Sequence, residues 1–199
     1  INMSLRKDGR NIFADETDKF GLSQDAYYFI GGLMKHVYSM TAITNPLVNS
    51  YKRLVSGFEA PLHITWSVTN RSPLIRIPSS FGSGTRIELR SPDSAANPYL
   101  TIALCLAAGL DGIKNKITPP ENIQKNIFHM TEEEKEQLHI KSLPTNLYDA
   151  VCAMEKDAFI REVLGEHISN VYIGSKKDEW NRYCRAVTEW EVDTYLDKF

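Results

Sequence analysis

Apolar residues recur at helical spacing in three long parts of the chain. The first follows Ser23, whose side chain can cap a helix, and extends to about Thr41. The second begins at the Asn-Pro pair 97–98, a cap followed by proline at the first helical position, and runs to about Ile113. This second helix is apolar nearly all round, so we expect neighbouring elements to cover it on most sides. From Leu143 onward, the third part predicts a mostly helical region.

Shorter segments alternate apolar and polar residues, which is typical of strands with one buried face. Such segments are residues 1–5 and 63–67, and an Asp-Gly pair at 8–9 predicts a turn after the first of them. Within 70–90, two short β-type runs are joined by a Gly/Ser-rich loop, as in a hairpin with a long connection. The pattern therefore predicts an α+β fold, in which an antiparallel sheet is flanked by helices and followed by a helical C-terminal region.

Two further helices are predicted from local signals. Asn45 followed by Pro46 is typical of a helix start, so we expect a short helix through Arg53. Near the end of the chain, aromatic and apolar residues predict one last long helix that extends as far as Trp190. Packing, rather than cofactor binding, is the expected role of its marker residues: Trp180, Tyr183, Cys184, Val187 and Trp190.

The last run of the hairpin presents a charged face. Alternation places Arg86, Glu88 and Arg90 together, while the apolar residues between them face the core; Arg71 and Arg76 lie in the preceding run. Arginine offers a rigid fork of donors that suits carboxylate and phosphate oxygens, and a glutamate among arginines can neutralise them or hold a cation. The alternative is a solvated sheet face with weak surface ion pairs, and spacing alone favours this alternative.

Composition narrows the class of protein. The 199 residues carry a net charge of −2, which argues against electrostatically driven nucleic-acid binding. Three widely spaced cysteines form neither a disulfide framework nor a C-x-x-C zinc motif, so we expect a reducing cytoplasm.

The longest uncharged run, 94–110, is shorter than the roughly 20 residues of a membrane span. No signal peptide opens the chain, and no phosphate-loop or serine-nucleophile motif occurs in it.

An ordered set of short motifs then makes the resemblance to a known family specific. The motifs are 45–54 (NPLVNSYKRL), 57–61 (GFEAP), 70–72 (NRS), 75–78 (IRIP), 86–90 (RIELR), 91–99 (SPDSAANPY), 108–114 (AGLDGIK) and 164–167 (LGEH). In this order, they closely resemble the C-terminal part of a bacterial type I glutamine synthetase, and the resemblance covers essentially the whole chain. This ordered set reverses the preference for a merely solvated face.

The resemblance implies a fold and an activity. The expected fold is part of the family's catalytic half-barrel, with 1–118 as the sheet-containing active-site portion and 119–199 as a mostly helical portion of the same domain. The implied reaction joins ammonia to L-glutamate at the expense of ATP, through a γ-glutamyl phosphate. It implies Mg²⁺ or Mn²⁺, a cytoplasmic homo-oligomer (a dodecamer in the family), and no direct contact with nucleic acid or membrane.

The resemblance also assigns roles to residues, motif by motif. Glu88 matches a metal ligand, and Glu59 and Arg71 match catalytic groups, with Glu59 on a loop that closes over the site. The residues matched to glutamate binding are Arg53, Glu59, Arg71 and Arg90. The residues matched to nucleotide binding are Asn2, Met3, Ser4, Arg71, Arg76 and Arg86.

Departures from the family pattern leave alternatives open. The family's other metal carboxylates, a metal-binding histidine and the N-terminal β-grasp domain lie upstream of Ile1, so the chain is expected to be a fragment that is inactive alone. Phe128 stands where adenylylated members carry a tyrosine. A γ-glutamyl–amine ligase of the same superfamily, with a polyamine or other amine in place of ammonia, is a second enzyme hypothesis, and a non-catalytic assembly or regulatory module is a third.

Overall fold

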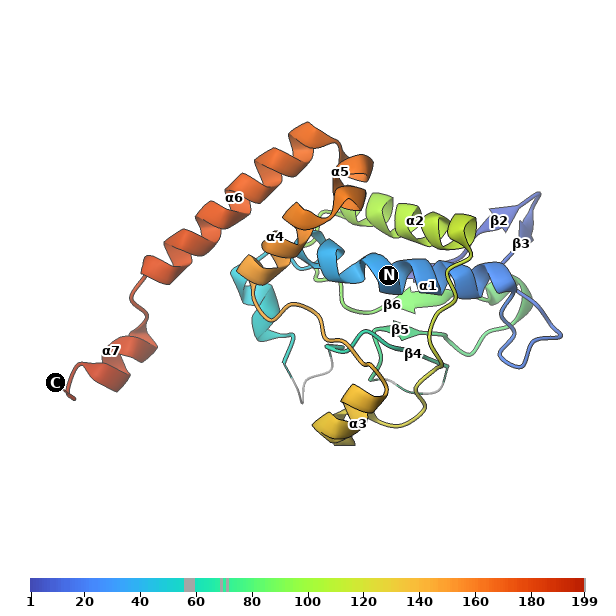
Figure 1. The fold of residues 1–199 in the computed structure, drawn as a ribbon, viewed down its shortest axis with the longest axis horizontal. Helices are drawn as coiled ribbons and strands as arrows, with labels where there is room; N and C mark the ends of the chain where they lie inside the picture. Colours follow the sequence, from blue (N-terminus) through green and yellow to red (C-terminus); the bar gives the residue numbers. More distant parts are fainter. Residues whose placement is uncertain (56–59, 69, 71, 199) are drawn as a thin grey trace.

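The computed structural model describes residues 1–55, 60–68, 70 and 72–198. Its largest contact joins two helices, α1 (Gln24–Thr44) and α2 (Pro98–Asn115), which lie together over a small sheet (Figure 1). The sheet has the order β1-β6-β5-β4, with strands β1 (Asn2–Met3), β6 (Ile87–Leu89), β5 (Ile75–Arg76) and β4 (Trp66–Ser67). The α+β fold class is confirmed, with helices against a mostly antiparallel sheet.

The strands pair as the hairpin pattern predicts. β5 and β6 are antiparallel, with Ile75 opposite Leu89 and Arg76 opposite Glu88, and β1 is antiparallel to β6. Among the strands of the described residues, β4 and β5 alone run parallel. A separate hairpin of β2 (Arg6–Lys7) and β3 (Arg10–Asn11) encloses the predicted Asp-Gly turn, and both turn residues have positive φ, as a tight two-residue hairpin requires.

The remaining elements are short apart from one helix. Three 3₁₀ turns occur at η1 (Val48–Lys52), η2 (Gly82–Gly84) and η3 (Ile127–His129). The helical C-terminal region consists of α3 (Glu132–Gln137), α4 (Leu147–Lys156), α5 (Ala158–Leu164), α6 (Glu166–Arg185) and α7 (Glu189–Tyr195). α6 packs on α5 and α4, with contacts to α4 as far along as Trp180, and leads away from the sheet towards α7 (Figure 1).

The core lies between the helix layer and the sheet. Its fully buried large side chains come from α1, from the loops around it and from the inner face of the strands, as the alternation in 86–90 predicts. They include Phe13, Leu22, Phe29, Ile30, Leu33, Met40, Ile43, Leu54, Leu74, Ile75, Ile87 and Leu89.

Glycines bring α1 and α2 together at backbone distance. A Cβ at Gly32 would lie 2.1 Å from the carbonyl oxygen of Ala108, and a Cβ at Gly112 would lie 2.0 Å from the carbonyl oxygen of Tyr28. Because no real Cβ comes so close to a backbone atom, this contact requires glycine on both helices. The α1–α2 layer is therefore fixed by positions that carry no side chain at all.

The structure corrects the helix predicted to start at Asn45. The Asn45 amide donates to the Thr41 carbonyl at 2.8 Å, so this residue ends α1 as its C-cap instead of beginning a new helix. Pro46 then prevents continuation, and the short 3₁₀ helix starts only after Leu47. A short helix does occur in this region, as predicted, but it begins at Val48 and not directly after Asn45.

The structure also corrects the expected covering of α2. Its length and its Asn97 cap are as predicted, with the Asn97 side chain accepting from the amides of Tyr99 and Leu100. α1 and α5 cover one side, but the opposite side exposes an apolar stripe of Ile102, Leu106 and Leu110. A helix apolar all round is thus covered on only part of its circumference by the described residues.

The last predicted helix is in fact two. α6 ends at Arg185, and Thr188 begins α7 by exchanging hydrogen bonds with Glu191 in a capping box. Trp180 packs between Tyr148 and Tyr183, as expected, but Val187 and Trp190 are mostly exposed. Among the described residues, no helix is both long and apolar enough to cross a bilayer.

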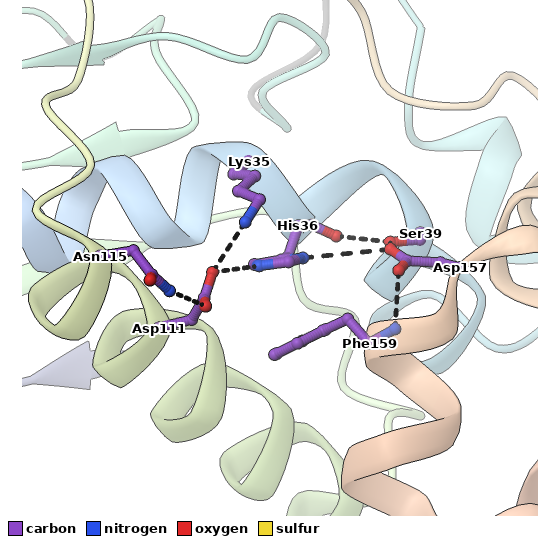
Figure 2. A network of polar contacts seen from close by, with 7 residues as sticks. All are labelled: Lys35, His36, Ser39, Asp111, Asn115, Asp157 and Phe159. Atoms are coloured by element: carbon purple, nitrogen blue, oxygen red, sulfur yellow. Dashed lines mark hydrogen bonds and ion pairs between the residues drawn. The ribbon is translucent and has the colours of Figure 1, made fainter.

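A polar network ties α1 to α2 and to the start of α5 (Figure 2). The Asp111 carboxylate on α2 lies 2.8 Å from His36 Nε2 and 2.9 Å from Lys35 Nζ, both on α1. His36 also stacks on Phe159, with ring centroids 3.7 Å apart, and Asp157 caps α5 through the Phe159 amide. These contacts supplement the glycine contact with charge-assisted hydrogen bonds across three helices.

The network predicts an acid-dependent contribution to stability. The hydrogen bond from His36, followed by that from Lys35, lowers the pKa of Asp111 to about 2 from 3.8. A lowered pKa in the folded state stabilises the protein above pH 4, and this contribution is lost as the pH falls towards 2. Asp111→Asn is therefore expected to lower the unfolding free energy at pH 7 but much less at pH 2, as measured by urea denaturation. Asp193→Asn on α7 is the control, and equal losses at both pH values for Asp111→Asn would contradict the prediction.

Candidate active site

The strand register assembles a row of polar side chains across the sheet. On β6, Glu88 lies opposite Asn2 of β1 on one side and opposite Arg76 of β5 on the other. Arg86 and Arg90 flank Glu88 along the chain and are half-buried like it, while Ile87 and Leu89 are fully buried. The predicted division of this run into a charged face and a core face is therefore observed.

Glu88 is held between two arginines. Its Oε2 atom lies 2.7 Å from Arg76 Nε and 4.0 Å from Arg90 Nε, so the three side chains form an ion-paired group. The Arg76–Glu88 contact is an ion pair without the alignment of a hydrogen bond, and Glu88 Oε2 is buried without a hydrogen-bond donor in the described residues. The Arg76 guanidinium therefore already compensates the charge of this oxygen, and the remaining lone pairs of the carboxylate are what a further cation could use.

Arg86 is positioned by the edge strand and the preceding loop. Its Nε donates to Asn2 Oδ1 at 3.2 Å, and its Nη1 donates to Ser80 Oγ at 2.8 Å and to the Gly84 carbonyl at 3.2 Å. Ser80 also donates to the Gly84 carbonyl, which closes the loop around the guanidinium. Asn2, Ser80 and Arg86 thus form one connected unit at the β1 edge.

Arg53, which follows the 3₁₀ helix η1, is hydrogen-bonded to the residue after Arg90. Its Nη2 donates to the Ser91 carbonyl at 2.7 Å and to Asn45 Oδ1 at 3.1 Å. Burial would raise the pKa of Asp93, but the Ala95 amide, the Ser50 hydroxyl and the Arg53 guanidinium lower it below its usual value. Arg53 is therefore fixed by neutral acceptors and sits in the field of an ionised carboxylate.

The predicted site residues are partly brought together. Arg76, Arg86, Glu88 and Arg90 meet on one face of β5 and β6, with Asn2 beside them and Arg90 donating to the Pro73 carbonyl at 3.3 Å. Ser4 is exposed and Met3 half-buried, just beyond this group in β1 and the loop after it. Glu59 and Arg71, the two residues predicted to be catalytic, lie outside the described residues.

Sequence reasoning missed the residues that hold these arginines. Ser80 and Gly84 belong to the Gly/Ser-rich loop that was expected only to connect two strands, and Asn45 was expected to cap a helix. A serine within that loop and an asparagine before a proline were the available signals. Within the described part of the chain, no cluster of three or more His, Cys, Asp or Glu residues could hold a metal ion by itself.

Comparison with known proteins assigns the chain to a family. Residues 1–195 match the family model for the glutamine synthetase catalytic domain. The chain is 52% identical over 199 residues to a glutamine synthetase of Clostridium saccharobutylicum, and 55% identical over 195 residues to one of Methanosarcina mazei. These alignments include 100% and 98% of this chain but 45% and 44% of those proteins. The chain therefore belongs to the glutamine synthetase catalytic-domain family and spans less than half the length of these relatives.

Solved structures agree with this assignment. A complex of GmaS with ADP superposes with a TM-score of 0.86 at 40% identity, over 98% of this chain and 45% of that chain. GmaS without ligand superposes with a TM-score of 0.80 at 41% identity, over 94% of this chain and 41% of that chain. At these identities, the arrangement of sheet and helices described above is that of the family.

Proposed function

We propose that this chain is the C-terminal part of a glutamate–ammonia ligase catalytic domain, which joins ammonia to L-glutamate with ATP through a γ-glutamyl phosphate. The observation that carries the proposal is the row Asn2, Glu88 and Arg76 with Arg86 and Arg90 beside it. Phosphoryl transfer is mostly a matter of positioning several anions and neutralising their charge, and this row offers converging cations around one carboxylate.

The position of each site residue on or beside the sheet suggests which substrate it holds. Arg76 and Arg86, with the edge strand 2–4, are proposed to hold the nucleotide; the binding of ADP by GmaS supports this for a related fold. Arg90 and Arg53, adjacent through Ser91, are proposed to hold the carboxylates of glutamate. Glu59 and Arg71 are proposed to complete the site, as loop carboxylate and as cation at the transferred phosphoryl group.

Glu88 is the proposed ligand for Mg²⁺ or Mn²⁺. Its carboxylate is half-buried on the polar face of the sheet and has lone pairs beyond the one directed at Arg76, which fits such an ion; the ion would neutralise phosphate charge when bound. A divalent ion of this kind takes about six oxygen ligands, and the described residues contain no cluster of three or more His, Cys, Asp or Glu that could hold it. The other ligands are therefore proposed to come from polypeptide that corresponds to the remaining part of the relatives.

Because the described residues do not supply all the ligands of the proposed metal ion, the full-length protein and the isolated chain are expected to differ in activity. The full-length protein is expected to form γ-glutamyl hydroxamate and ATP-dependent glutamine with Mg²⁺ or Mn²⁺, and the isolated 199-residue chain is expected to form neither. Methylamine and a polyamine offered in place of ammonia test the amine-ligase alternative. Preferred turnover of an amine would replace the ammonia assignment, and the absence of any ligase activity in the full-length protein would leave only an assembly or regulatory role.

Assembly is the remaining part of the proposal. We propose a cytoplasmic homo-oligomer in which each chain contributes one such catalytic part. The exposed apolar residues of α7 and of the turn before it, Val187, Trp190, Val192 and Leu196, support a role of this end in contacts between subunits. Size measurement of the full-length protein with and without residues after Gly165 separates this role from catalysis.

Arginine-to-lysine variants should distinguish the proposed glutamate-binding arginine from the proposed nucleotide-binding arginine by which KM each variant changes. Lysine keeps the positive charge but loses the two-pronged guanidinium contact. Arg90→Lys in the full-length protein is expected to raise the KM for glutamate about tenfold or more while the KM for ATP stays within twofold. Arg86→Lys is the matched variant and is expected to show the opposite pattern. Steady-state kinetics with each substrate varied in turn would reveal an exchange of roles, which would contradict the assignment.

A further inference from the structure

A second concave region lies away from the charged face of the sheet. It is an open cavity of about 650 Å³ bounded by α1, by the segment 117–120 that follows α2, and by residues 139–141 that follow α3. In Figure 1 the chain leaving α2 runs past α1 towards α3, which brings these segments together. The volume is within the range of small-molecule sites in proteins.

The walls of this cavity are fixed by the fold. A Cβ at Gly31 would lie 2.0 Å from the Ile117 carbonyl oxygen, so the first wall contacts the α1 backbone directly. The indole of Trp66 donates to the Pro120 carbonyl at 2.7 Å and fixes the other end of that wall. On the opposite side, the Ile64 amide donates to the Lys141 carbonyl at 2.7 Å. The cavity is therefore preformed and needs no rearrangement to admit a ligand.

Its lining combines positive charge with apolar surface. Lys35, Lys141 and His139 contribute to the lining, and none of the lining residues is acidic. Lys35 gives one hydrogen bond to Asp111 but retains further ammonium donors, and in the described residues Lys141 forms no ion pair. His139 is held in the left-handed region at φ 51°, an uncommon conformation for a residue other than glycine, at the mouth formed by 139–141.

The apolar residues of the lining also restrict which ligands fit the cavity. Met34 and the ring of Tyr38 come from α1, and Ile64, Ile117 and the prolines 119–120 face them across the cavity. Such walls favour a flat or compact apolar body, and the cations favour a carboxylate or phosphate attached to it.

We propose that this cavity is a binding site for a small organic anion, a carboxylate or phosphate ester carried on an apolar or aromatic body. The site is separate from the proposed catalytic face: its lining shares no residue with the group around Glu88. Lys35 joins it to the Asp111–His36 network between α1 and α2, so an anion that competes for this ammonium acts on the contact between those helices (Figure 2).

The test uses phenyl phosphate and benzoate as probes on the full-length protein. Saturation-transfer NMR is recorded with ADP in excess, so that a nucleotide site does not contribute, and inorganic phosphate is measured in parallel. Lys141→Glu reverses one charge of the lining, and Thr118→Trp places bulk in the cavity from an exposed position. Lys7→Glu, the same charge change on the distant β2–β3 hairpin, is the control.

The expected result is millimolar or tighter binding of both probes, weakened about tenfold by Lys141→Glu, abolished by Thr118→Trp and unchanged by Lys7→Glu. Inorganic phosphate is expected to bind at least tenfold more weakly, because it lacks the apolar body. Circular dichroism spectra that match the unaltered protein exclude misfolding of the variants. Failure of both probes to bind at 10 mM, equal effects of the two glutamate variants, or equal binding of inorganic phosphate would each overturn the proposal.

Discussion

Glu88→Ala in the full-length protein is expected to keep its fold and to lose nearly all ligase activity. The fold should survive because Glu88 lies on the polar face of β6, while the core residues on either side of it are unchanged. Activity should fall at least about 100-fold, the loss typical when a group that stabilises developing charge is removed.

The measurement is the hydroxamate assay at saturating Mg²⁺, with thermal unfolding to check the fold. Glu136→Ala, which removes an exposed carboxylate from α3, is the matched control and should leave turnover unchanged. Turnover of Glu88→Ala within a few-fold of the unaltered enzyme would show that the paired arginines, and not a metal, use this carboxylate.

Gly32→Ala is expected to destabilise the protein by about 3 kcal/mol or more, an effect large for the addition of one methyl group. The new Cβ would lie 2.1 Å from the Ala108 carbonyl oxygen and 2.7 Å from the Gly112 amide nitrogen. Both are backbone atoms of α2, so neither can move aside as a side chain could, and the helices must separate. Separation would also strain the Asp111–His36 contact beside it.

Gly174→Ala provides the opposite case on α6. No atom lies within 4 Å of a Cβ at that position, and alanine is favoured over glycine in a helix by up to about 1 kcal/mol. Denaturant unfolding of both variants in the full-length protein should therefore show a large loss for the first and a small gain for the second. Similar small changes at the two positions would contradict the close approach of α1 and α2.

The parts of the fold that follow from local physics were predictable. Alternation along 86–90 gives the two faces of β6, and Ser23, Asn97 and Thr131 each cap the helix that follows, because capping depends on residues only two or three positions apart. The placement of arginines around Glu88 also follows from alternation, once β5 and β6 pair in the observed register.

The failures have a common cause in tertiary contact. Whether Asn45 ends one helix or starts the next depends on how far α1 continues, and how much of α2 is covered depends on which helices pack on it. The Asp111–His36 contact joins residues 75 positions apart, and no local pattern in the sequence indicates it. Motif resemblance assigns roles that periodicity alone cannot, and all of these roles remain predictions, including those of Glu59 and Arg71.

The pairing of β1 with β6 has a consequence for the order of events during refolding. Asn2 meets Arg86 and Glu88 only when segments 84 or more positions apart come together, and the ordering of such distant segments is slow compared with helix formation. Regain of helical circular dichroism should therefore precede completion of the sheet. A refolding intermediate with its helices formed would still lack the β1 edge, and with it the nucleotide site proposed there.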